Sequence, residues 1–95
     1  MSRDEVFKKL KAIKPELISR YGVKSLAIFG SYARGDYRED SDIDILVDVD
    51  PSIGLKFVDL SDFLEASLNL KADVVSKRAI KPYAWEFIKK ELIDV

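Results

Sequence analysis

The sequence contains no cysteine and no histidine. Without cysteine, the chain forms no disulfide bond and offers no nucleophilic thiolate. Without either residue type, a serine–histidine triad, a cysteine–histidine dyad and an ordinary zinc site are all excluded. The side chains that remain for chemistry are carboxylates, lysines, tyrosines and hydroxyls. Carboxylate oxygens are the ligands that hard divalent ions such as magnesium prefer.

Long apolar runs and a strong charge bias are also missing. The longest apolar runs have four or five residues, far fewer than a membrane-spanning helix needs. The N-terminal stretch "MSRDEVFKKL" has no apolar signal region, so we expect a cytoplasmic protein without a membrane partner. The net charge of −1 argues against direct nucleic-acid binding, which generally needs a basic face. A small nucleotide or a protein partner remains open.

The length and composition predict one small domain over residues 1–95. A chain of 95 residues has room for one modest core. Its hydrophobic fraction of 47% is spread along the sequence, which favours a folded chain over a disordered one.

The first element is expected to be a helix from about Arg3 to Arg20. Ser2 and Glu5 have the spacing of a capping box at its start, and Gly22 is a natural stop. Pro15 is expected to bend or split the helix. The apolar residues follow a helical stripe, namely Val6, Leu10, Ile13, Leu17 and Tyr21.

Two strands follow in the first half of the chain. The apolar run Ser25–Phe29 predicts a buried strand, after which "SYARG" predicts a short helical turn. "DIDILVDVD", residues 42–50, alternates between acids and apolar residues with Leu46 as the one exception, and predicts the second strand. One face of this strand is apolar and the other carries most of the acids.

The second half predicts a helix, a strand and a last helix. The helix covers residues 55–70, the strand residues 70–76, and the last helix residues 80–95 with Pro82 in its first turn. The apolar residues of the last helix occupy more than one face, so one face is expected to be core and the remainder a partner surface.

This α-β-α-β-α-β-α order predicts an α/β fold. The link between the first two strands is short and mostly loop, which suits an antiparallel pair. The second and third strands are joined by a whole helix, which suits a parallel crossover. We therefore expect a small mixed three-stranded sheet in the order 1-2-3, flanked by helices.

The acids of the second strand form the first chemical motif. Asp42 and Asp44 are two residues apart, so their carboxylates project from the same face. Such close carboxylates repel each other unless a positive charge lies between them. Two Mg²⁺ ions would supply that charge, one on substrate phosphate oxygens and one at an attacking hydroxyl. The alternative is a solvated strand face, which is how we interpret Asp48 and Asp50.

A phosphate-binding turn is expected where the first strand ends. Gly30 lets a phosphate approach the backbone, and Ser31 adds a hydroxyl to the free N–H groups of the following helical turn. Arg34 either reaches a triphosphate oxygen or pairs with Asp36 or Asp40. The alternative roles of Gly30 and Ser31, as turn glycine and helix cap, are compatible with phosphate binding.

Three further residues are candidates for the site. Asp73 is the only acid of the third strand, and parallel pairing would bring it beside Asp44. There it would complete the metal site and act as the base for the incoming hydroxyl. Tyr32 and Tyr37 either stack on a base or are ordinary loop tyrosines.

The spaced motif resembles the DNA polymerase β-like nucleotidyltransferase superfamily. It consists of Gly30-Ser31, ten intervening residues, Asp42-x-Asp44, and Asp73 on the next strand. The resemblance covers nearly the whole chain, and the short length is similar to the minimal nucleotidyltransferase (MNT) proteins. It implies a polymerase β-like core in which Asp42, Asp44 and Asp73 are catalytic metal ligands and Gly30, Ser31 and Arg34 bind the nucleotide.

The resemblance also implies a reaction and a partner. A hydroxyl attacks the α-phosphorus of ATP with Mg²⁺ as cofactor, and AMP is transferred. In the MNT family the acceptor is a tyrosine of a HEPN-domain toxin, so the chain would act as the antitoxin of that pair, in a homo- or hetero-oligomer. Two alternatives remain: neutralisation of a toxin by binding alone, and transfer to a small-molecule hydroxyl.

Overall fold

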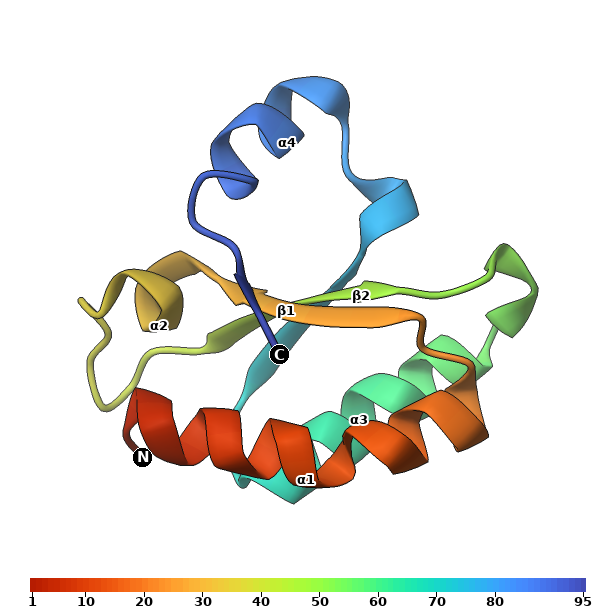
Figure 1. Ribbon diagram of the computed structural model, residues 1–95, viewed down its shortest axis with the longest axis horizontal. Helices are drawn as coiled ribbons and strands as arrows, with labels where there is room; N and C mark the ends of the chain where they lie inside the picture. The colour runs from red at the N-terminus through yellow and green to blue at the C-terminus, as the bar shows by residue number, and fades with distance from the viewer.

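The computed structural model describes residues 1–95 as a sheet with helices on both sides (Figure 1). Besides two short 3-10 turns at Pro51–Ile53 and Lys77–Ala79, the elements are α1 (Arg3–Tyr21), β1 (Ser25–Phe29), α2 (Gly30–Arg34), β2 (Ile43–Asp48), α3 (Lys56–Leu68), β3 (Ala72–Ser76), α4 (Pro82–Ile88) and β4 (Ile93–Asp94). No helix is both long enough and apolar enough to cross a membrane.

The sheet has four strands in the order β3-β2-β1-β4. The β1–β2 pair is antiparallel and the β2–β3 pair is parallel, which confirms the predicted mixed sheet and the order of its first three strands. The fourth strand, β4, pairs antiparallel with β1 at the other edge. The α/β class is therefore confirmed, with one strand more than predicted.

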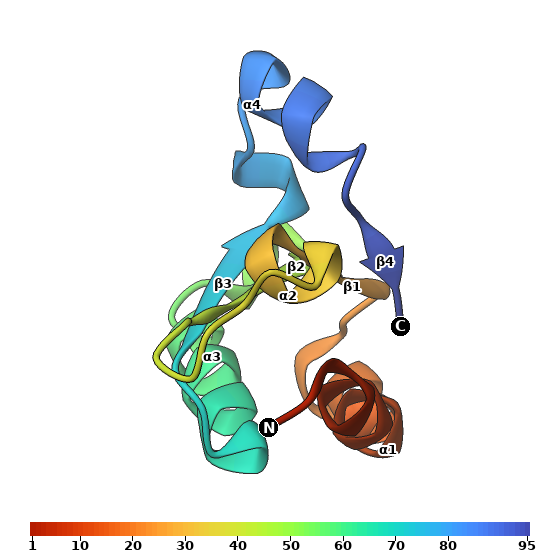
Figure 2. The same ribbon diagram turned by 90° about the vertical axis from the view of Figure 1, so that its left-hand side faces the viewer.

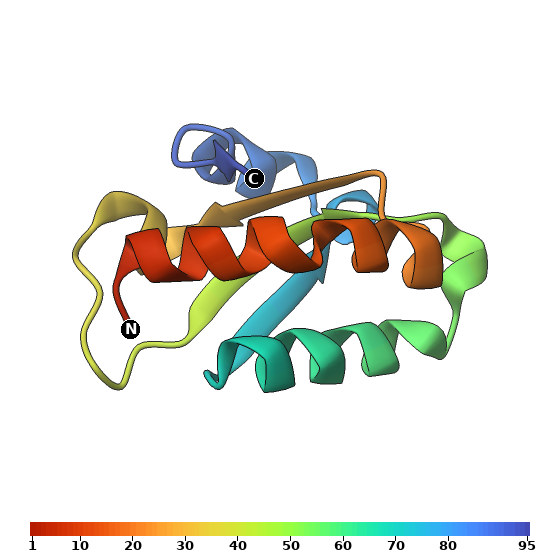
Figure 3. The same cartoon turned by 60° about the horizontal axis from the view of Figure 1, so that its bottom comes forward.

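The core lies between one face of the sheet and the pair α1 and α3. Figures 2 and 3 show these two helices side by side on that face, with α4 on the opposite side. Alternation in β2 sends Ile43, Ile45 and Val47 into this core. The two helices contribute apolar residues at helical spacing, all fully buried: Val6, Leu10, Leu17, Leu60, Leu64 and Leu68.

Helix α1 begins and ends as its local signals predict. The Ser2 hydroxyl accepts from the Glu5 backbone N–H at 3.2 Å, and the Glu5 carboxylate accepts from the Ser2 N–H at 3.4 Å. Gly22 ends the helix in the left-handed conformation with φ of 68°. The expected split at Pro15 does not occur, because the helix runs through this residue.

The C-terminal prediction was wrong in part. A helix over residues 80–95 was expected, but α4 ends at Ile88, and the chain returns to the sheet as β4. Ile93 lies opposite Ile28, and the Val95 N–H donates to the Leu26 carbonyl at 2.9 Å. The free edge of β1 provides backbone partners for this segment, which override its helical apolar spacing.

Candidate functional site

The strand register brings the predicted acids to one end of the sheet. Asp44 lies opposite Phe29, the last residue of β1, and beside Asp73 of β3. Because Gly30 directly follows Phe29, the turn into α2 begins next to Asp44. Asp42 lies just before β2 and is exposed, as is Asp73, whereas Asp44 is half-buried. The structure therefore gathers the predicted residues from three strands.

Gly30 and Asp44 are in direct contact. A Cβ atom added at residue 30 would collide with the Asp44 carboxylate and lie 3.0 Å from its Cγ. Gly30 also has φ of +72°, a conformation that L side chains rarely adopt. Both facts require glycine here, and they place the backbone of the predicted phosphate-binding turn against a predicted metal ligand.

The electrostatics around Asp44 favour a bound cation. Burial, followed by the negative charges of Asp73, Asp42 and Glu91, raises the pKa of Asp44 to about 6, against the lowering effect of Arg34. A divalent cation beside Asp44 would offset both the burial and the repulsion. The all-carboxylate donor set thus fits Mg²⁺ rather than a soft metal.

The protein donors do not form a complete metal site by themselves. No group of three or more acidic side chains is drawn together closely enough to hold an ion alone. Mg²⁺ commonly takes one or two carboxylates and fills its remaining positions with water and substrate phosphates. The pair Asp44 and Asp73, with Asp42 beside it, is compatible with that mode of binding.

Glu91 is a site residue that the sequence did not predict. Its Oε2 accepts a hydrogen bond of 2.7 Å from the Gly30 N–H and one of 3.0 Å from the Arg34 guanidinium. A second bond of 3.1 Å joins Arg34 to Oε1. Glu91 follows α4, within the segment predicted as helix, so no local signal placed it near Gly30.

Arg34 is held between two acids at this end of the sheet. Besides its bonds to Glu91, its Nε donates to Asp36 at 3.2 Å. The hydrogen bond to Asp36, followed by the charges of Asp36 and Glu91, raises the pKa of Arg34 against the lowering effect of desolvation. Of the two predicted acid partners of Arg34, the structure thus shows Asp36 and not Asp40.

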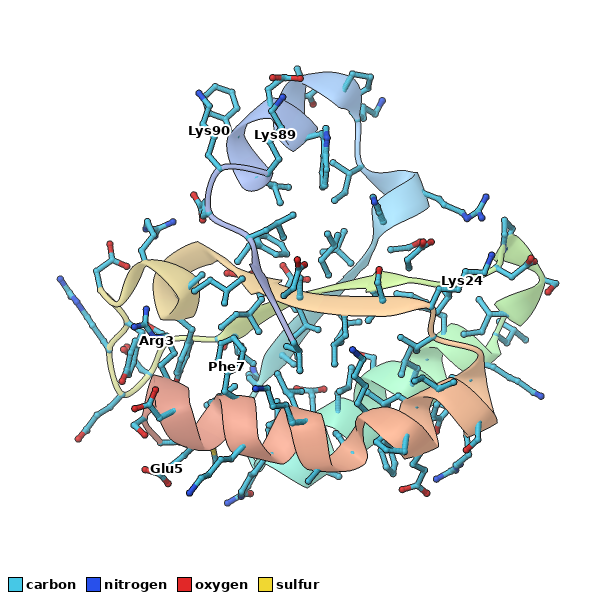
Figure 4. All side chains as sticks on the ribbon, viewed as in Figure 1. Arg3, Glu5, Phe7, Lys24, Lys89 and Lys90 are labelled. Atoms are coloured by element: carbon cyan, nitrogen blue, oxygen red, sulfur yellow. The ribbon has the colours of Figure 1, made fainter.

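The two tyrosines next to the site have structural roles. Tyr32 is 2% exposed and belongs to the core. Its ring stacks on that of Tyr37, with the centroids 4.2 Å apart, and the Tyr37 hydroxyl accepts from the Arg3 N–H at 3.2 Å. Figure 4 shows Arg3 at the α2 end of the molecule, near the loop that carries Tyr37. Tyr32 is therefore not free to stack on a base, and one face of the Tyr37 ring is already covered by Tyr32.

The site lies on an open surface at one end of the sheet and not in an enclosed pocket. The surface hollows are lined by other residues, the largest by Arg20, Tyr21, Lys56, Asp59, Asp62 and Phe63. This open surface leaves Asp42 and Asp73 accessible to a large molecule as well as to a small one.

Comparisons with known proteins identify the family of this chain. The family model for the nucleotidyltransferase domain matches residues 10–95. The protein adenylyltransferase MntA of Thermococcus cleftensis is 42% identical over 97 residues, an alignment that covers 100% of this chain and 97% of that protein.

Solved structures show the same fold. One assigned as a minimal nucleotidyltransferase has a TM-score of 0.84 and 34% identity, covering 100% of this chain and 97% of its own. A complex of the tri-AMPylated Shewanella oneidensis HEPN toxin with its MNT antitoxin contains a chain with a TM-score of 0.55 and 20% identity, covering 97% of this chain and 66% of that one. The chain described here belongs to the nucleotidyltransferase-domain family and is a nucleotidyltransferase.

Proposed function

We propose that the protein is a magnesium-dependent protein adenylyltransferase. It transfers AMP from ATP to a tyrosine hydroxyl of a HEPN-type toxin partner and so acts as the antitoxin of that pair. The observation that carries the proposal is the contact between Gly30 and Asp44, with Asp73 on the adjacent strand. A turn suited to phosphate and an acid cluster suited to Mg²⁺ meet there.

Each residue has a defined task in this proposal. Gly30 and Ser31 hold the triphosphate through backbone N–H groups and the Ser31 hydroxyl, and Arg34 neutralises its charge. Asp42, Asp44 and Asp73 hold the magnesium. When bound, the metal neutralises charge on the phosphate oxygens and lowers the pKa of the attacking hydroxyl.

The transfer forms one bond and breaks one. The hydroxyl oxygen of the acceptor bonds to the α-phosphorus of ATP, and the bond from that phosphorus to the bridging oxygen of pyrophosphate breaks. Asp73, exposed at the edge of the site, accepts the proton of the hydroxyl as general base. The pyrophosphate leaves with the bond's electron pair.

A protein acceptor is favoured by the shape of the site and by the relatives. Asp73 and Asp42 are exposed on an open surface, so a side chain on another folded domain can approach them. The relative MntA is named a protein adenylyltransferase, and the HEPN toxin found with an MNT antitoxin is AMPylated. These names support ATP as the donor and a HEPN protein as the acceptor.

The test is nucleotidyl transfer to a HEPN-domain protein of the organism that makes this chain. Purified partner, Mg²⁺ and α-labelled ATP are mixed with the wild type, with Asp44→Asn and with Asp48→Asn. Asp48 lies on the same strand face as Asp44 but four residues further along β2, which makes it a matched control. Label on the partner with wild type and Asp48→Asn, and none with Asp44→Asn or with γ-labelled ATP, is the expected result.

Other results would redirect the assignment. If Asp44→Asn still neutralises the toxin, binding alone is sufficient and the transfer is not the antitoxin activity. If α-label accumulates in an acid-soluble product and not on protein, the acceptor is a small molecule. Mapping of the labelled peptide decides whether the acceptor is tyrosine.

A further inference from the structure

The Glu91 carboxylate occupies the hydrogen-bond donors that the proposed function assigns to the nucleotide. It accepts from the Gly30 N–H at 2.7 Å and from the Arg34 guanidinium at 3.0 and 3.1 Å. A backbone N–H at a glycine turn and an arginine fork are the donors that bind a phosphate group. A carboxylate and a phosphate oxygen cannot both accept from the same N–H at full strength.

Glu91 lies between a firmly held segment and a loosely held one. After it, β4 pairs with β1, and the Val95 carbonyl accepts from Lys14 Nζ at 2.8 Å. Before it, no residue of α4 is buried, and Tyr83 and Phe87 are 72% and 71% exposed. Figure 4 shows that Lys89 and Lys90, next to Glu91, lie on the far side of the sheet from α1.

We propose that Glu91 is an intramolecular competitor of the nucleotide, so that the magnesium-bound triphosphate binds by displacing Glu91 from Gly30 and Arg34. The displacement removes an anchor of the segment 82–91, and α4 becomes more mobile while β4 stays paired. This inference rests on the proposed function for the identity of the ligand.

The strength of the contact suits a displaceable group. The side chains of Arg34 and Glu91 are 48% and 26% exposed, and ion pairs with that exposure to water are generally weak. A triphosphate with its metal offers more charge and more acceptors than one carboxylate. If Glu91 occupies the donors most of the time, the apparent affinity for nucleotide equals the intrinsic affinity multiplied by the small fraction of molecules in which the donors are open.

The first experiment compares nucleotide affinity in three chains by calorimetry with magnesium and a non-hydrolysable ATP analogue. Glu91→Gln should bind the analogue roughly three- to tenfold more tightly than wild type, because the amide is a weaker acceptor and carries no charge. Asp36→Asn is the matched control. It removes an acid from the same guanidinium at 3.2 Å without touching Gly30, and its affinity should rise much less.

The outcomes separate this inference from the proposed function. Equal or weaker binding by Glu91→Gln, with the wild type binding normally, overturns the inference alone and makes Glu91 a positioning residue. An equal gain of nucleotide affinity in Asp36→Asn would mean that the loss of any negative charge beside Arg34 has this effect. That result would also overturn the inference. Absence of binding by every chain counts against both proposals. Thermal melts confirm that all three chains are folded.

Hydrogen exchange gives a second readout that does not depend on affinity. In the wild type, the analogue and magnesium should speed amide exchange in residues 82–91 while exchange in residues 93–95 stays unchanged. In Glu91→Gln this segment should exchange fast already without the analogue. Slower or unchanged exchange over residues 82–91 on nucleotide binding would contradict the displacement.

Discussion

The Asp44 carboxylate lies where the side chain of any residue other than glycine at position 30 would begin. This contact joins the end of β1 to the start of β2. It explains why glycine at position 30 occurs together with an acid at position 44. Glycine at this position removes no apolar contact from the core, because residue 30 lies after β1 and begins α2.

Gly30→Ala should therefore impair both the fold and the site. The variant must adopt a positive φ with a Cβ atom and must push Asp44 aside, so we expect a loss of about 1–3 kcal/mol in the free energy of unfolding. Nucleotidyl transfer should fall by roughly a hundredfold or more, because misplacement of a site by about 1 Å has that effect. Urea denaturation and the α-label assay measure the two losses.

Gly22→Ala is the matched control for this variant. Gly22 has φ of +68°, close to that of Gly30, but a Cβ atom added there would meet nothing within 4 Å. Its stability should fall by about 1 kcal/mol from backbone strain alone, with transfer retained. Equal losses of transfer in the two variants would show that the contact with Asp44 is irrelevant to the site.

The stability of the metal-free protein should depend on the ionisation of Asp44. The pKa of this carboxyl is raised from 3.8 to about 6 in the folded chain, so the folded chain holds the proton more tightly than the unfolded chain. The stability contributed by the neutral acid is full below about pH 4 and is lost as the pH rises to about 6. Above that pH, the ionised carboxylate makes the folded state less stable.

Asp44→Asn removes this penalty and should be more stable than wild type at pH 7. We expect a gain of about 1 kcal/mol, which allows for solvent screening of a half-buried group. Denaturation midpoints measured between pH 4 and 8 test the sign. Asp48→Asn should keep the pH dependence of the wild type, and a flat profile in the wild type would refute the raised pKa.

The parts of the fold that local signals specify could be predicted from the sequence. The capping box at Ser2 and Glu5 begins α1, and the apolar run Ser25–Phe29 forms β1 with the predicted bounds. Alternation in β2 and the helical crossover predict that β3 runs parallel to β2, and the register in the structure then places Asp73 beside Asp44. These features depend on period and connection length, which a single sequence displays.

The position of Glu91 could not be predicted, because it depends on a tertiary contact. Ile88 and Leu92 are spaced as in a helix, and nothing between them signals a turn. The segment leaves the helical path because β1 has an unpaired edge that accepts Ile93 and Val95. Tyr32 is similarly ambiguous in the sequence, since a tyrosine after a Gly-Ser turn resembles a loop residue, whereas in the fold it is buried and stacked on Tyr37.

Tyr37 should be dispensable for nucleotide binding but necessary for stability. Its ring stacks on Tyr32 and its hydroxyl accepts from the Arg3 N–H. Tyr37→Ala removes both contacts, which together are worth about 1–3 kcal/mol. The analogue should bind with unchanged affinity in calorimetry, whereas the denaturation midpoint should fall.

Tyr83→Ala provides the comparison for this loss. Tyr83 is 72% exposed on α4, so its truncation should change the free energy of unfolding by less than about 0.5 kcal/mol. A large loss of nucleotide affinity in Tyr37→Ala, in a chain that is still folded, would instead assign its ring to the base.

Removal of divalent metal should abolish nucleotidyl transfer completely and reversibly. The carboxylates at the site repel one another, and burial adds to the penalty on Asp44, so a triphosphate cannot bind productively beside them without a cation. EDTA should stop labelling, and excess Mg²⁺ should restore it. Mn²⁺ should replace Mg²⁺, because both accept oxygen ligands. Zn²⁺ should do so poorly, since the chain offers neither histidine nor cysteine.

The control is the same Mg²⁺ titration after EDTA in two variants. Asp44→Asn should show no recovery of transfer at any Mg²⁺ concentration, while Asp48→Asn should follow the wild-type curve. Transfer that persists in EDTA would exclude the metal-dependent mechanism and would leave Arg34 as the main positive group for the phosphates.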